Sequence, residues 1–449
     1  MERPLLIIGG GESGVGAALL AAQQGWTPHV VDEGTIHESR KAELAHRQIT
    51  YWENASVLPK TYWALAVISP GIPPAHRWIQ QLKDAHTPIE GEIDFAFRYD
   101  TAPVIAITGS NGKTTTTLLI AHILNRLGKK AVPVGNMGIS YARRLAEENA
   151  PVEYRVIETS SFQLEHIRRF RPNVGVITNI TIDHLDRHGS LDAYAAAKFH
   201  LFDFQTPHDI AILPGDNSDL LHRFDQGHYL SQLHTFGLFP HSSVDAWWEG
   251  NCLYVRWSGT VVSFELAKRR IIGSHNQLNI AAAVMAVISA LQEAPSPAVL
   301  EEAVATFSPV AHRIEYVATY RGVAYYNDSK ATNVDAAYYA LSTFDSPIIW
   351  IVGGVDKGND YGRLVELARR RVRQIIVLGP HRSAWQAAFD GIIPIGYAED
   401  MESAVRQAAD IARPGEVVLL SPACASFDLF LNFEQRGDAF RKSVQQLIQ

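Results

Sequence analysis

The run Thr-Gly-Ser-Asn-Gly-Lys-Thr at residues 108–114 has the composition of a loop that binds polyphosphate. An apolar stretch at 104–107 precedes this run, and a helix-compatible stretch follows it at 115–127. A strand, loop and helix of this kind place successive backbone N–H groups at a helix N-terminus, where they cradle phosphate. The sequence therefore predicts that the chain binds a nucleoside triphosphate.

Individual residues of this run match the roles that phosphate binding requires. Gly109 and Gly112 permit a close approach of the backbone to phosphate. Lys113 adds a positive charge, and the Thr114 hydroxyl is suited to holding Mg²⁺. The run departs from the full G-x-x-x-x-G-K-S/T pattern, because Ile107 stands where the first glycine belongs. A chance Gly-Lys-Thr is the alternative, and the flanking strand and helix argue against it.

Polar residues also follow other predicted strands, at the edge where open parallel sheets bind ligands. Glu158 ends the apolar stretch 154–157 and is a carboxylate that a strand can aim at a metal; an acidic helix cap is the alternative. His184, after the predicted strand at 174–179, is either a metal ligand or a structural histidine. Lys198, taken by itself, is typical of a solvated helix position.

The last third of the chain carries one notable arginine and two polar loops. Arg313 follows the inferred second domain boundary, and its fork suits the paired oxygens of a terminal phosphate; a surface salt bridge is the alternative. Residues 327–333 follow a strand and are too polar to be core. Residues 353–358 also follow a strand, and their glycines leave Lys357 on an accessible loop. Both segments are typical of ligand loops.

The N-terminus begins with a βαβ pattern. Gly9, Gly11 and Gly14 give G-x-G-x-x-G directly after a short strand, and Asp32 and Glu33 close the second strand. In a dinucleotide-binding unit the acidic residue after the second strand binds a ribose. Tight packing between strand and helix explains the same glycines, so this motif alone leaves both interpretations open.

These sites require an α/β protein of three domains, expected at residues 1–93, 94–308 and 309–449. Alternation of strands with helices predicts parallel sheets, and residues 229–264 read as an antiparallel insertion. Strands are expected at 5–8, 29–31, 65–69, 104–107, 132–134, 154–158, 174–179, 210–213, 323–326, 348–352, 374–378 and 417–420. Helices are expected at 15–24, 90–99, 115–127, 273–292 and 298–306.

Composition limits the classes of function. The chain has 449 residues, a net charge of −7 and a pI near 6.2, which gives no general field for nucleic acid. Its two cysteines, Cys252 and Cys424, form no disulfide framework and no metal-ligand spacing. The longest apolar stretch, 280–291, is too short to span a bilayer. We expect a cytoplasmic protein without membrane insertion and without a nucleic-acid partner.

The motifs taken together resemble the Mur ligases of peptidoglycan synthesis. The resemblance spans residues 5 to 440, and residues 420–437 are similar to the branch of that family that adds D-glutamate. The motifs that carry it, in order along the chain, are 108–114, 135–138, 158–165, 179–188, 194–198, 275–279, 312–315, 327–333 and 353–358.

The resemblance implies a Rossmann-like UDP-binding domain, a central P-loop ATPase-like domain and a C-terminal Rossmann-like domain. It implies ATP-dependent addition of D-glutamate to UDP-N-acetylmuramoyl-L-alanine through an acyl phosphate. The implied cofactors are ATP, two Mg²⁺ ions and a carbamate on Lys198, and the implied state is a monomer. Because ATP and amino acid would bind different domains, we expect domain closure about a hinge near residues 307–310.

The resemblance also implies a role for each matching residue. UDP-substrate contacts would come from Gly11, Ser13, Gly14, Asp32, Glu33, Ser69, Gly71 and Asn136. ATP contacts would come from Gly109, Asn111, Gly112, Lys113, Thr114, Thr115, Asn276, Asn279, Arg313 and Asp328. Metal ligands would be Thr114, Glu158, His184 and Lys198. D-Glutamate would contact Lys330, Thr332, Lys357, Ser426 and the Phe433 backbone. The residues implied in catalysis are Lys113, His184, Lys198 and Arg313.

Four alternatives remain at this point. The next ligase of the same family usually carries Asp-Asn-Pro-Arg, which is absent here. Folylpolyglutamate synthases share the ATP machinery but do not explain the N-terminal domain together with residues 420–437. A non-catalytic nucleotide-binding protein is expected to lose metal ligands, and a nicotinamide-dependent oxidoreductase predicts no second nucleotide site.

Overall fold

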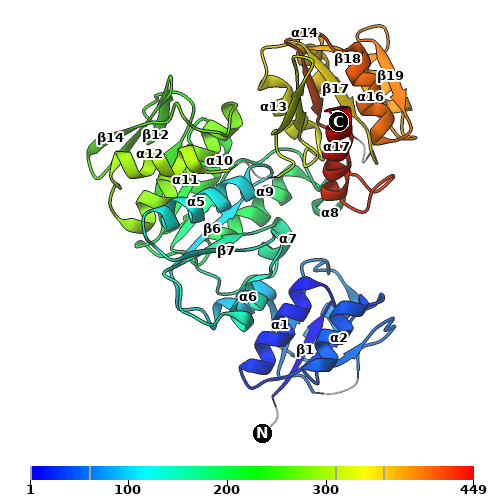
Figure 1. The fold of residues 1–449 in the computed structure, drawn as a ribbon. Helices are drawn as coiled ribbons and strands as arrows, with labels where there is room; N and C mark the ends of the chain where they lie inside the picture. Colours follow the sequence, from blue (N-terminus) through cyan, green and yellow to red (C-terminus); the bar gives the residue numbers. More distant parts are fainter. Residues whose placement is uncertain (1–2, 60–61, 309–310, 357–358, 449) are drawn as a thin grey trace. The chain divides into compact units, whose positions relative to one another are not determined.

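The computed structural model describes residues 3–59, 62–308, 311–356 and 359–448. It is an α/β fold that separates into two compact units, described here one at a time (Figure 1). Two sheets belong to the first unit and one to the second, which matches the three-domain α/β architecture expected from the sequence. The domain boundaries at 93 and 308 stay a prediction. The first unit comprises Met1–Lys268 and Leu278–Ala305, and the second comprises Arg269–Gln277 and Thr306–Gln449.

The N-terminal sheet of the first unit has five parallel strands in the order β3-β2-β1-β4-β5. The order reverses between β1 and β4, which creates the crevice that doubly wound sheets use for ligands. Helix α1 begins at Glu12, three residues before the expected start at Val15, because Gly11 already serves as its N-cap. The strands are β1 (Pro4–Ile8), β2 (Thr27–Val31), β3 (Thr50–Trp52), β4 (Leu65–Ile68) and β5 (Ile89–Gly91).

The central sheet of the first unit has nine strands in the order β14-β13-β12-β11-β10-β9-β6-β8-β7. Strand β11 pairs parallel with β10, so the segment 229–264 extends this sheet. The expected antiparallel insertion is therefore wrong for its first part, and antiparallel pairing links only β12, β13 and β14. The strands are β6 (Val104–Thr108), β7 (Ala131–Gly135), β8 (Tyr154–Glu158), β9 (Val174–Ile177), β10 (Ile210–Pro214), β11 (Gln232–Phe236), β12 (Ala246–Glu249), β13 (Cys252–Trp257) and β14 (Thr260–Glu265).

Helices α1 and α6 pack closely within the first unit. A Cβ at Gly16 would meet Ser140 Oγ at 2.3 Å, so glycine lets the two helices approach. Arg143 on α6 pairs with Glu12 at 2.7 Å and with Glu43 at 2.5 Å. The helices are α1 (Glu12–Gln23), α2 (Glu38–His46), α3 (Arg77–Asp84), α4 (Glu92–Phe97), α5 (Lys113–Arg126), α6 (Tyr141–Glu147), α7 (Ser161–Leu164), α8 (Leu185–His188), α9 (Leu191–Phe199), η1 (His200–Phe202), α10 (Ser218–Gln226), α11 (Ser274–Leu291) and α12 (Pro297–Thr306).

The sheet of the second unit has six strands in the order β15-β16-β20-β17-β18-β19. All pairs are parallel except β15 with β16. The sequence reading missed both edge strands, because their partly exposed residues lack the continuous apolar run of the central strands. The strands are β15 (Glu315–Tyr320), β16 (Val323–Asn327), β17 (Ile348–Val352), β18 (Val372–Leu378), β19 (Ile395–Ala398) and β20 (Val417–Leu420).

Both faces of this sheet are buried. Successive residues of β17 alternate between two hydrophobic clusters, with Trp350 in one and Ile349 and Ile351 in the other. Helix α17 packs beside α16, as Figure 1 shows at the C-terminal end of the chain. The helices are α13 (Val334–Ser342), α14 (Gly362–Arg371), α15 (Ser383–Phe389), α16 (Met401–Ile411) and α17 (Phe433–Ile448).

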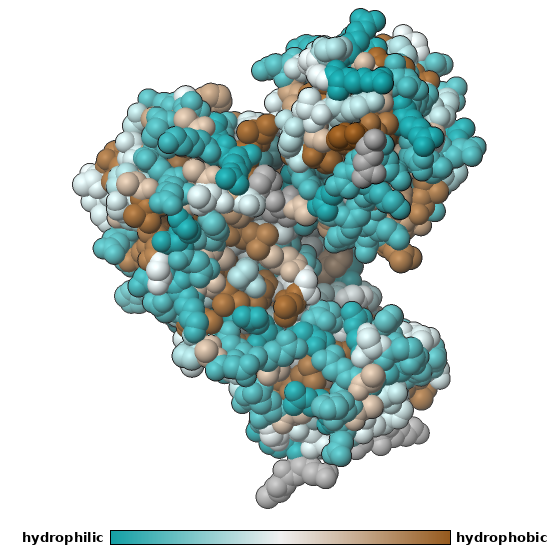
Figure 2. All heavy atoms as spheres, in the orientation of Figure 1, coloured by the Kyte–Doolittle hydropathy of each residue, from teal (hydrophilic) through white to brown (hydrophobic). Residues whose placement is uncertain are grey.

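Figure 2 shows one face of both units as mostly hydrophilic, with hydrophobic residues scattered in small groups. Within the described ranges, no helix combines the length and the apolar character needed to cross a bilayer. Apolar residues instead fill the cores on either side of the sheets.

Candidate functional site

The phosphate loop lies between β6 and α5, as the sequence predicts. Gly109 has φ of +143° and Gly112 has φ of +84°, which side chains rarely tolerate. A Cβ at Gly109 would meet Thr178 Oγ1 at 2.0 Å, and one at Gly112 would meet Asn279 Oδ1 at 2.2 Å. Both glycines are therefore required by backbone conformation and by close neighbours.

Residues that follow β9 hold this loop in place. The backbone N–H of Ser110 donates to the Asn179 carbonyl at 2.9 Å, and the Asn111 N–H donates to Asn179 Oδ1 at 3.0 Å. In return Asn179 Nδ2 donates to the Asn111 carbonyl at 2.9 Å, as does Thr178 Oγ1 at 2.5 Å. The sequence analysis assigned no role to Thr178 and Asn179. Their position directly after a buried strand was the signal that could have identified them.

Two lysines donate to the same carbonyl of the phosphate loop. Lys113 Nζ lies 2.9 Å from the Gly109 carbonyl oxygen, and Lys198 Nζ lies 2.8 Å from the same atom. Lys198 is 1% exposed, so its sequence-based description as a solvated helix position is wrong. Helix α9 turns this residue inward, toward the loop after β6.

The environment of Lys198 favours a neutral amine. Burial and then the neighbouring Lys113 charge lower its pKa well below the usual value, and Asp183 and Glu158 only partly offset them. Nζ also lies 4.4 Å from the centroid of the Tyr194 ring. A neutral lysine amine can react with CO₂, whereas an ammonium cannot.

Glu158 ends β8, next to the strand that leads into the phosphate loop. It does not cap the following helix, because Ser160 is the N-cap of α7 and forms a capping box with Gln163. Oε1 accepts a hydrogen bond from Asn136 Nδ2 at 3.1 Å. Oε2 is buried and has no hydrogen-bond partner among the described residues. An unpaired buried carboxylate oxygen fits a cation ligand.

His184 precedes α8 with φ of +52°. Its ring lies 5.0 Å from the Phe162 ring and 6.1 Å from the Tyr194 ring. Asp183 accepts from the His184 N–H at 2.9 Å and is not the N-cap of α8. Among the described residues, no three His, Cys, Asp or Glu side chains form a group suited to a metal. Of the expected metal ligands, Glu158 and His184 are of those types, whereas the other two are the Thr114 hydroxyl and Lys198.

The residues expected to contact the UDP-substrate gather at the carboxyl ends of β1, β2 and β4. The Gly10 N–H donates to Asp32 Oδ2 at 2.6 Å, and Ser69 Oγ donates to the Gly9 carbonyl at 3.3 Å. A Cβ at Gly14 would meet that carbonyl oxygen at 1.8 Å, which explains this glycine by packing. Gly11 and Ser13 lie in the same turn and Gly71 follows β4, whereas Asn136 follows β7 of the central sheet.

Glu33 makes a surface ion pair. Its carboxylate accepts hydrogen bonds from Arg77 at 2.5 Å and His76 at 3.1 Å. These partners, His76 first, lower its pKa.

In the second unit, Asp328 follows β16 and is buried. Its carboxylate accepts from Ser421 Oγ at 2.9 Å and from the Ile314 N–H at 3.2 Å. Burial raises its pKa to about 7, although the Arg313 charge acts in the opposite direction. His275 in this unit has its pKa lowered to about 3 by burial and then by Arg313.

The side chains expected to contact D-glutamate lie on loops at one edge of this sheet. The Lys330 ammonium lies 5.3 Å from the Phe433 ring, and Ser426 is buried in the loop after β20. Thr332 is exposed on the loop after β16. Lys357 lies outside the described residues, as do two residues of the expected hinge at 307–310.

Two further residues of the expected ATP set come from α11. Asn279 lies beside Gly112 of the phosphate loop. Its Oδ1 accepts a hydrogen bond from Thr116 Oγ1 of α5 at 3.4 Å. Asn276 donates to the Ile272 carbonyl at 2.8 Å. Thr114 and Thr115 are buried in the first turn of α5.

Comparisons with known proteins place the chain among amide-forming ligases. Residues 107–287 match the family model of the Mur ligase middle domain, and residues 312–424 match that of the Mur ligase, glutamate ligase domain. The UDP-N-acetylmuramoylalanine--D-glutamate ligase of Christiangramia forsetii is 39% identical over 450 residues, which cover 100% of both chains. The protein of the same name from Cytophaga hutchinsonii is 39% identical over 454 residues, again 100% of both.

A solved structure supports the fold. MurF ligase from Thermotoga maritima in complex with ADP superposes with a TM-score of 0.62 at 17% identity, covering 93% of this chain and 95% of that chain. At this identity the similarity establishes the shared architecture alone.

Proposed function

Because this chain belongs to the Mur ligase family, we propose that the side chains grouped in its two units serve one ligation reaction. It is an ATP-dependent ligase that adds D-glutamate to UDP-N-acetylmuramoyl-L-alanine, and its products include ADP and phosphate. The reaction contributes to the synthesis of peptidoglycan precursors. The full-length similarity to UDP-N-acetylmuramoylalanine--D-glutamate ligases carries this assignment. The conformation of the phosphate loop and the inward-facing Lys198 agree with it.

The chemistry follows from the substrates. The terminal carboxylate of the UDP-substrate attacks the γ-phosphorus of ATP, and the bond to the ADP oxygen breaks. The acyl phosphate that forms is then attacked by the amine of D-glutamate. The amide bond forms as phosphate leaves and the amine loses a proton. Neither step needs an enzyme nucleophile, and the buried Cys424, whose thiol lies 3.0 Å from the Tyr361 hydroxyl, serves packing.

We assign the ATP phosphates to the loop between β6 and α5. Gly109 and Gly112 leave the loop backbone uncovered by side chains. The backbone N–H groups at the N-terminus of α5 are suited to binding an anion. Lys113 offsets the charge that develops on the transferred phosphoryl group. Asn111 and Thr115 complete this set in the loop and the first turn. Arg313 and Asp328 of the second unit are proposed for the terminal phosphate and the ribose, and Asn276 and Asn279 for the adenine side.

We propose that two Mg²⁺ ions and a carbamate on Lys198 complete the site. The supporting observations are the orphaned Glu158 Oε2 and the neutral form favoured at Lys198. The neutral amine would bond to CO₂ and release a proton, which gives an anionic carbamate whose oxygens can bind a metal. Thr114, Glu158, His184 and carbamylated Lys198 would hold the metal. Bound Mg²⁺ neutralises phosphate oxygens during transfer.

The remaining residues are proposed for substrate recognition. The UDP-substrate is assigned to the turn after β1 with Gly11, Ser13 and Gly14, together with the other residues of the N-terminal set named above and Asn136. D-Glutamate is assigned to Lys330, Thr332, Lys357, Ser426 and the Phe433 backbone. Cationic side chains suit a substrate with two carboxylates.

The working state proposed here is a cytoplasmic monomer. Both described cysteines are free, which fits a reducing compartment. Sedimentation at working concentration tests the monomer directly.

One experiment tests the whole proposal. Purified protein is incubated with ATP, Mg²⁺ and UDP-N-acetylmuramoyl-L-alanine, and phosphate release is measured with each of a panel of amino acids. We expect release that depends on D-glutamate, with formation of an equal amount of the amide. Phosphate release that does not depend on the amino acid, or that prefers a diamino acid, would contradict the assignment.

A further inference from the structure

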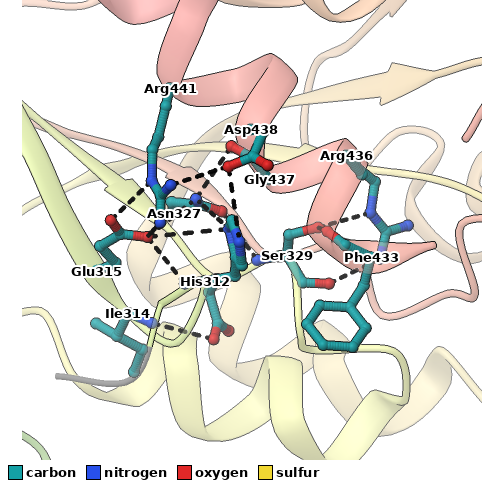
Figure 3. Close-up of polar contacts among 11 residues, drawn as sticks. His312, Ile314, Glu315, Asn327, Ser329, Phe433, Arg436, Gly437, Asp438 and Arg441 are labelled. Carbon is teal, nitrogen blue, oxygen red and sulfur yellow. Dashed lines mark hydrogen bonds and ion pairs between the residues drawn. The ribbon is translucent and has the colours of Figure 1, made fainter. Parts of the chain in front are cut away.

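Arg436 lies in the first turn of α17 and joins three loops of the second unit. It is 1% exposed. Its Nε donates to Ser329 Oγ at 3.0 Å, and Nη2 donates to the Ser329 carbonyl at 2.8 Å (Figure 3). Nη1 donates to the Gly353 carbonyl at 3.3 Å. The Cys424 carbonyl accepts from both Nη1 and Nη2 at 3.1 Å. One guanidinium therefore fixes three backbone segments.

The order of the strands explains why one side chain can reach all three loops. Strands β16, β20 and β17 are neighbours in the sheet, with β20 in the middle. Ser329, Cys424 and Gly353 follow the carboxyl ends of these parallel strands. This is the edge at which doubly wound sheets bind ligands. Lys330 and Ser426, both proposed for D-glutamate, lie one and two residues from two of the anchors.

The charges of Asp428 and Asp328 raise the pKa of Arg436 and offset part of the effect of its burial. Among the described residues its hydrogen-bond partners are carbonyl oxygens and one hydroxyl, and no acidic side chain forms an ion pair with it. Burial lowers its pKa to about 10, so the guanidinium stays charged at neutral pH. A buried cation of this kind favours an anionic ligand nearby, because interior charges are screened weakly.

The position of α17 is set by a separate group of contacts. A Cβ at Gly437 would meet His312 Nδ1 at 2.0 Å, so glycine is needed for the imidazole to pack against the helix. Asn327 Nδ2 donates to the Gly437 carbonyl at 3.1 Å, and Arg441 pairs with Glu315 at 2.8 Å (Figure 3). These contacts keep the first turn of α17, and with it Arg436, over the ends of the strands.

We propose that Arg436 is a positioning residue for the amino-acid substrate. It holds the loops after β16, β17 and β20 in the arrangement that receives a dicarboxylate amino acid, and it supplies positive potential to that pocket. Ser329 links the loop after β16 to the first turn of α17. Its hydroxyl accepts a hydrogen bond from Arg436 Nε and donates one to the Phe433 carbonyl at 2.8 Å. The inference rests on the proposed function and adds to it the residue that shapes the D-glutamate site.

The two chemical steps provide the test. Hydroxylamine traps an acyl phosphate as a hydroxamate and releases phosphate, so the first step is measured without D-glutamate. In Arg436→Lys we expect the KM for D-glutamate to rise at least tenfold, because an ammonium cannot reach three loops at once. The KM values for ATP and for the UDP-substrate, and the rate of hydroxamate formation, are expected to change less than about twofold.

Ser329→Ala is the second variant, because it removes only the hydroxyl bridge and stays informative if Arg436→Lys does not fold. We expect a rise of about threefold in the KM for D-glutamate alone. Arg373→Lys is the matched control: Arg373 is part-buried in the same unit, pairs with Glu416 at 2.7 Å, and is the second residue of β18, at the amino ends of the parallel strands. Its KM for D-glutamate is expected to stay unchanged.

Two results would overturn the inference. One is a folded Arg436→Lys protein with an unchanged KM for D-glutamate. The other is an equal loss in hydroxamate formation and in D-glutamate addition, which indicates general disruption of the unit. A parent protein that forms no hydroxamate with ATP and the UDP-substrate would instead refute the proposed function, and this inference with it.

Discussion

Lys198 in the first unit and Arg436 in the second are both buried basic side chains that donate to backbone carbonyls, yet burial has different chemical consequences for the two. Lys198 has one carbonyl partner, at 2.8 Å, whereas Arg436 makes its bonds to three segments. Burial lowers the pKa of both groups. A lowered pKa favours the neutral form of the Lys198 amine, but a guanidinium with a pKa of about 10 keeps its charge at neutral pH.

This difference indicates why each residue type occupies its position. The first unit needs a group that can become neutral and then accept CO₂ beside a phosphate-binding loop. The second unit needs a permanent cation whose fork can hold several carbonyls. The two residues are therefore not interchangeable.

The most damaging change is expected at Lys198. Lys198→Arg retains a positive charge but cannot form the carbamate, so we expect kcat to fall by about 10³-fold. Steady-state formation of the amide product measures this loss. Lys198→Ala is expected to regain part of its activity with acetate or propionate, because a small carboxylate can occupy the place of the carbamate. A fully active Lys198→Arg enzyme would remove the carbamate from the proposal.

Glu158 tests the partner of Lys198 in the metal site. In Glu158→Gln the orphaned carboxylate oxygen becomes part of a neutral amide, so we expect the Mg²⁺ concentration for half-maximal activity to rise by about 30-fold to 100-fold. Activity titrated against Mg²⁺ measures it. Glu153→Gln, at an exposed carboxylate of the same unit, serves as control and should leave the Mg²⁺ requirement unchanged.

Gly437 tests whether the position of α17 depends on distant contacts. Gly437→Ala is expected to destabilise the second unit by about 2 kcal/mol, because the new methyl group meets the His312 ring, although alanine favours a helix. Denaturant unfolding measures the change. The double variant His312→Ala/Gly437→Ala should show a favourable coupling energy. Simple addition of the two single effects would mean that the ring does not limit this position.

Glu92 extends the comparison to a buried acid. Burial raises its pKa to about 7, and the Ala142 N–H donates to its Oε1 at 2.6 Å. Between pH 4.5 and about 7 the folded state keeps a proton that the unfolded state has lost, so the free energy of unfolding falls as pH rises through this window.

Between pH 5.5 and 7.5, Glu92→Gln should remove about 2 kcal/mol of this fall in the free energy of unfolding. Urea unfolding at several pH values measures it. Burial also raises the pKa of Asp94 to about 6. The free energy of unfolding therefore keeps part of its pH dependence in both the parent protein and the variant. An unchanged slope in Glu92→Gln would show that another group is responsible.

Much of the phosphate site was predictable because its signal is local. A strand, a glycine-rich loop and a helix follow one another within residues 104–127, so spacing alone identifies the ligand class. The interior strands of the sheets were also predictable from continuous apolar runs. The two edge strands of the second unit were missed because they lack a continuous apolar run. Residues 229–264 were misread because pairing direction depends on which neighbour a strand meets.

What the sequence by itself determined is therefore the α/β class, the phosphate loop and the order of the motifs, since each depends on residues close together in the chain. Only the tertiary structure decided that Lys198 is buried against the Gly109 carbonyl and that Arg436 contacts Ser329, which lies 107 positions away in the chain. Burial and long-range hydrogen bonds depend on packing between distant segments, and that packing lowers the pKa of both side chains, although the guanidinium, with its higher ordinary pKa, stays charged.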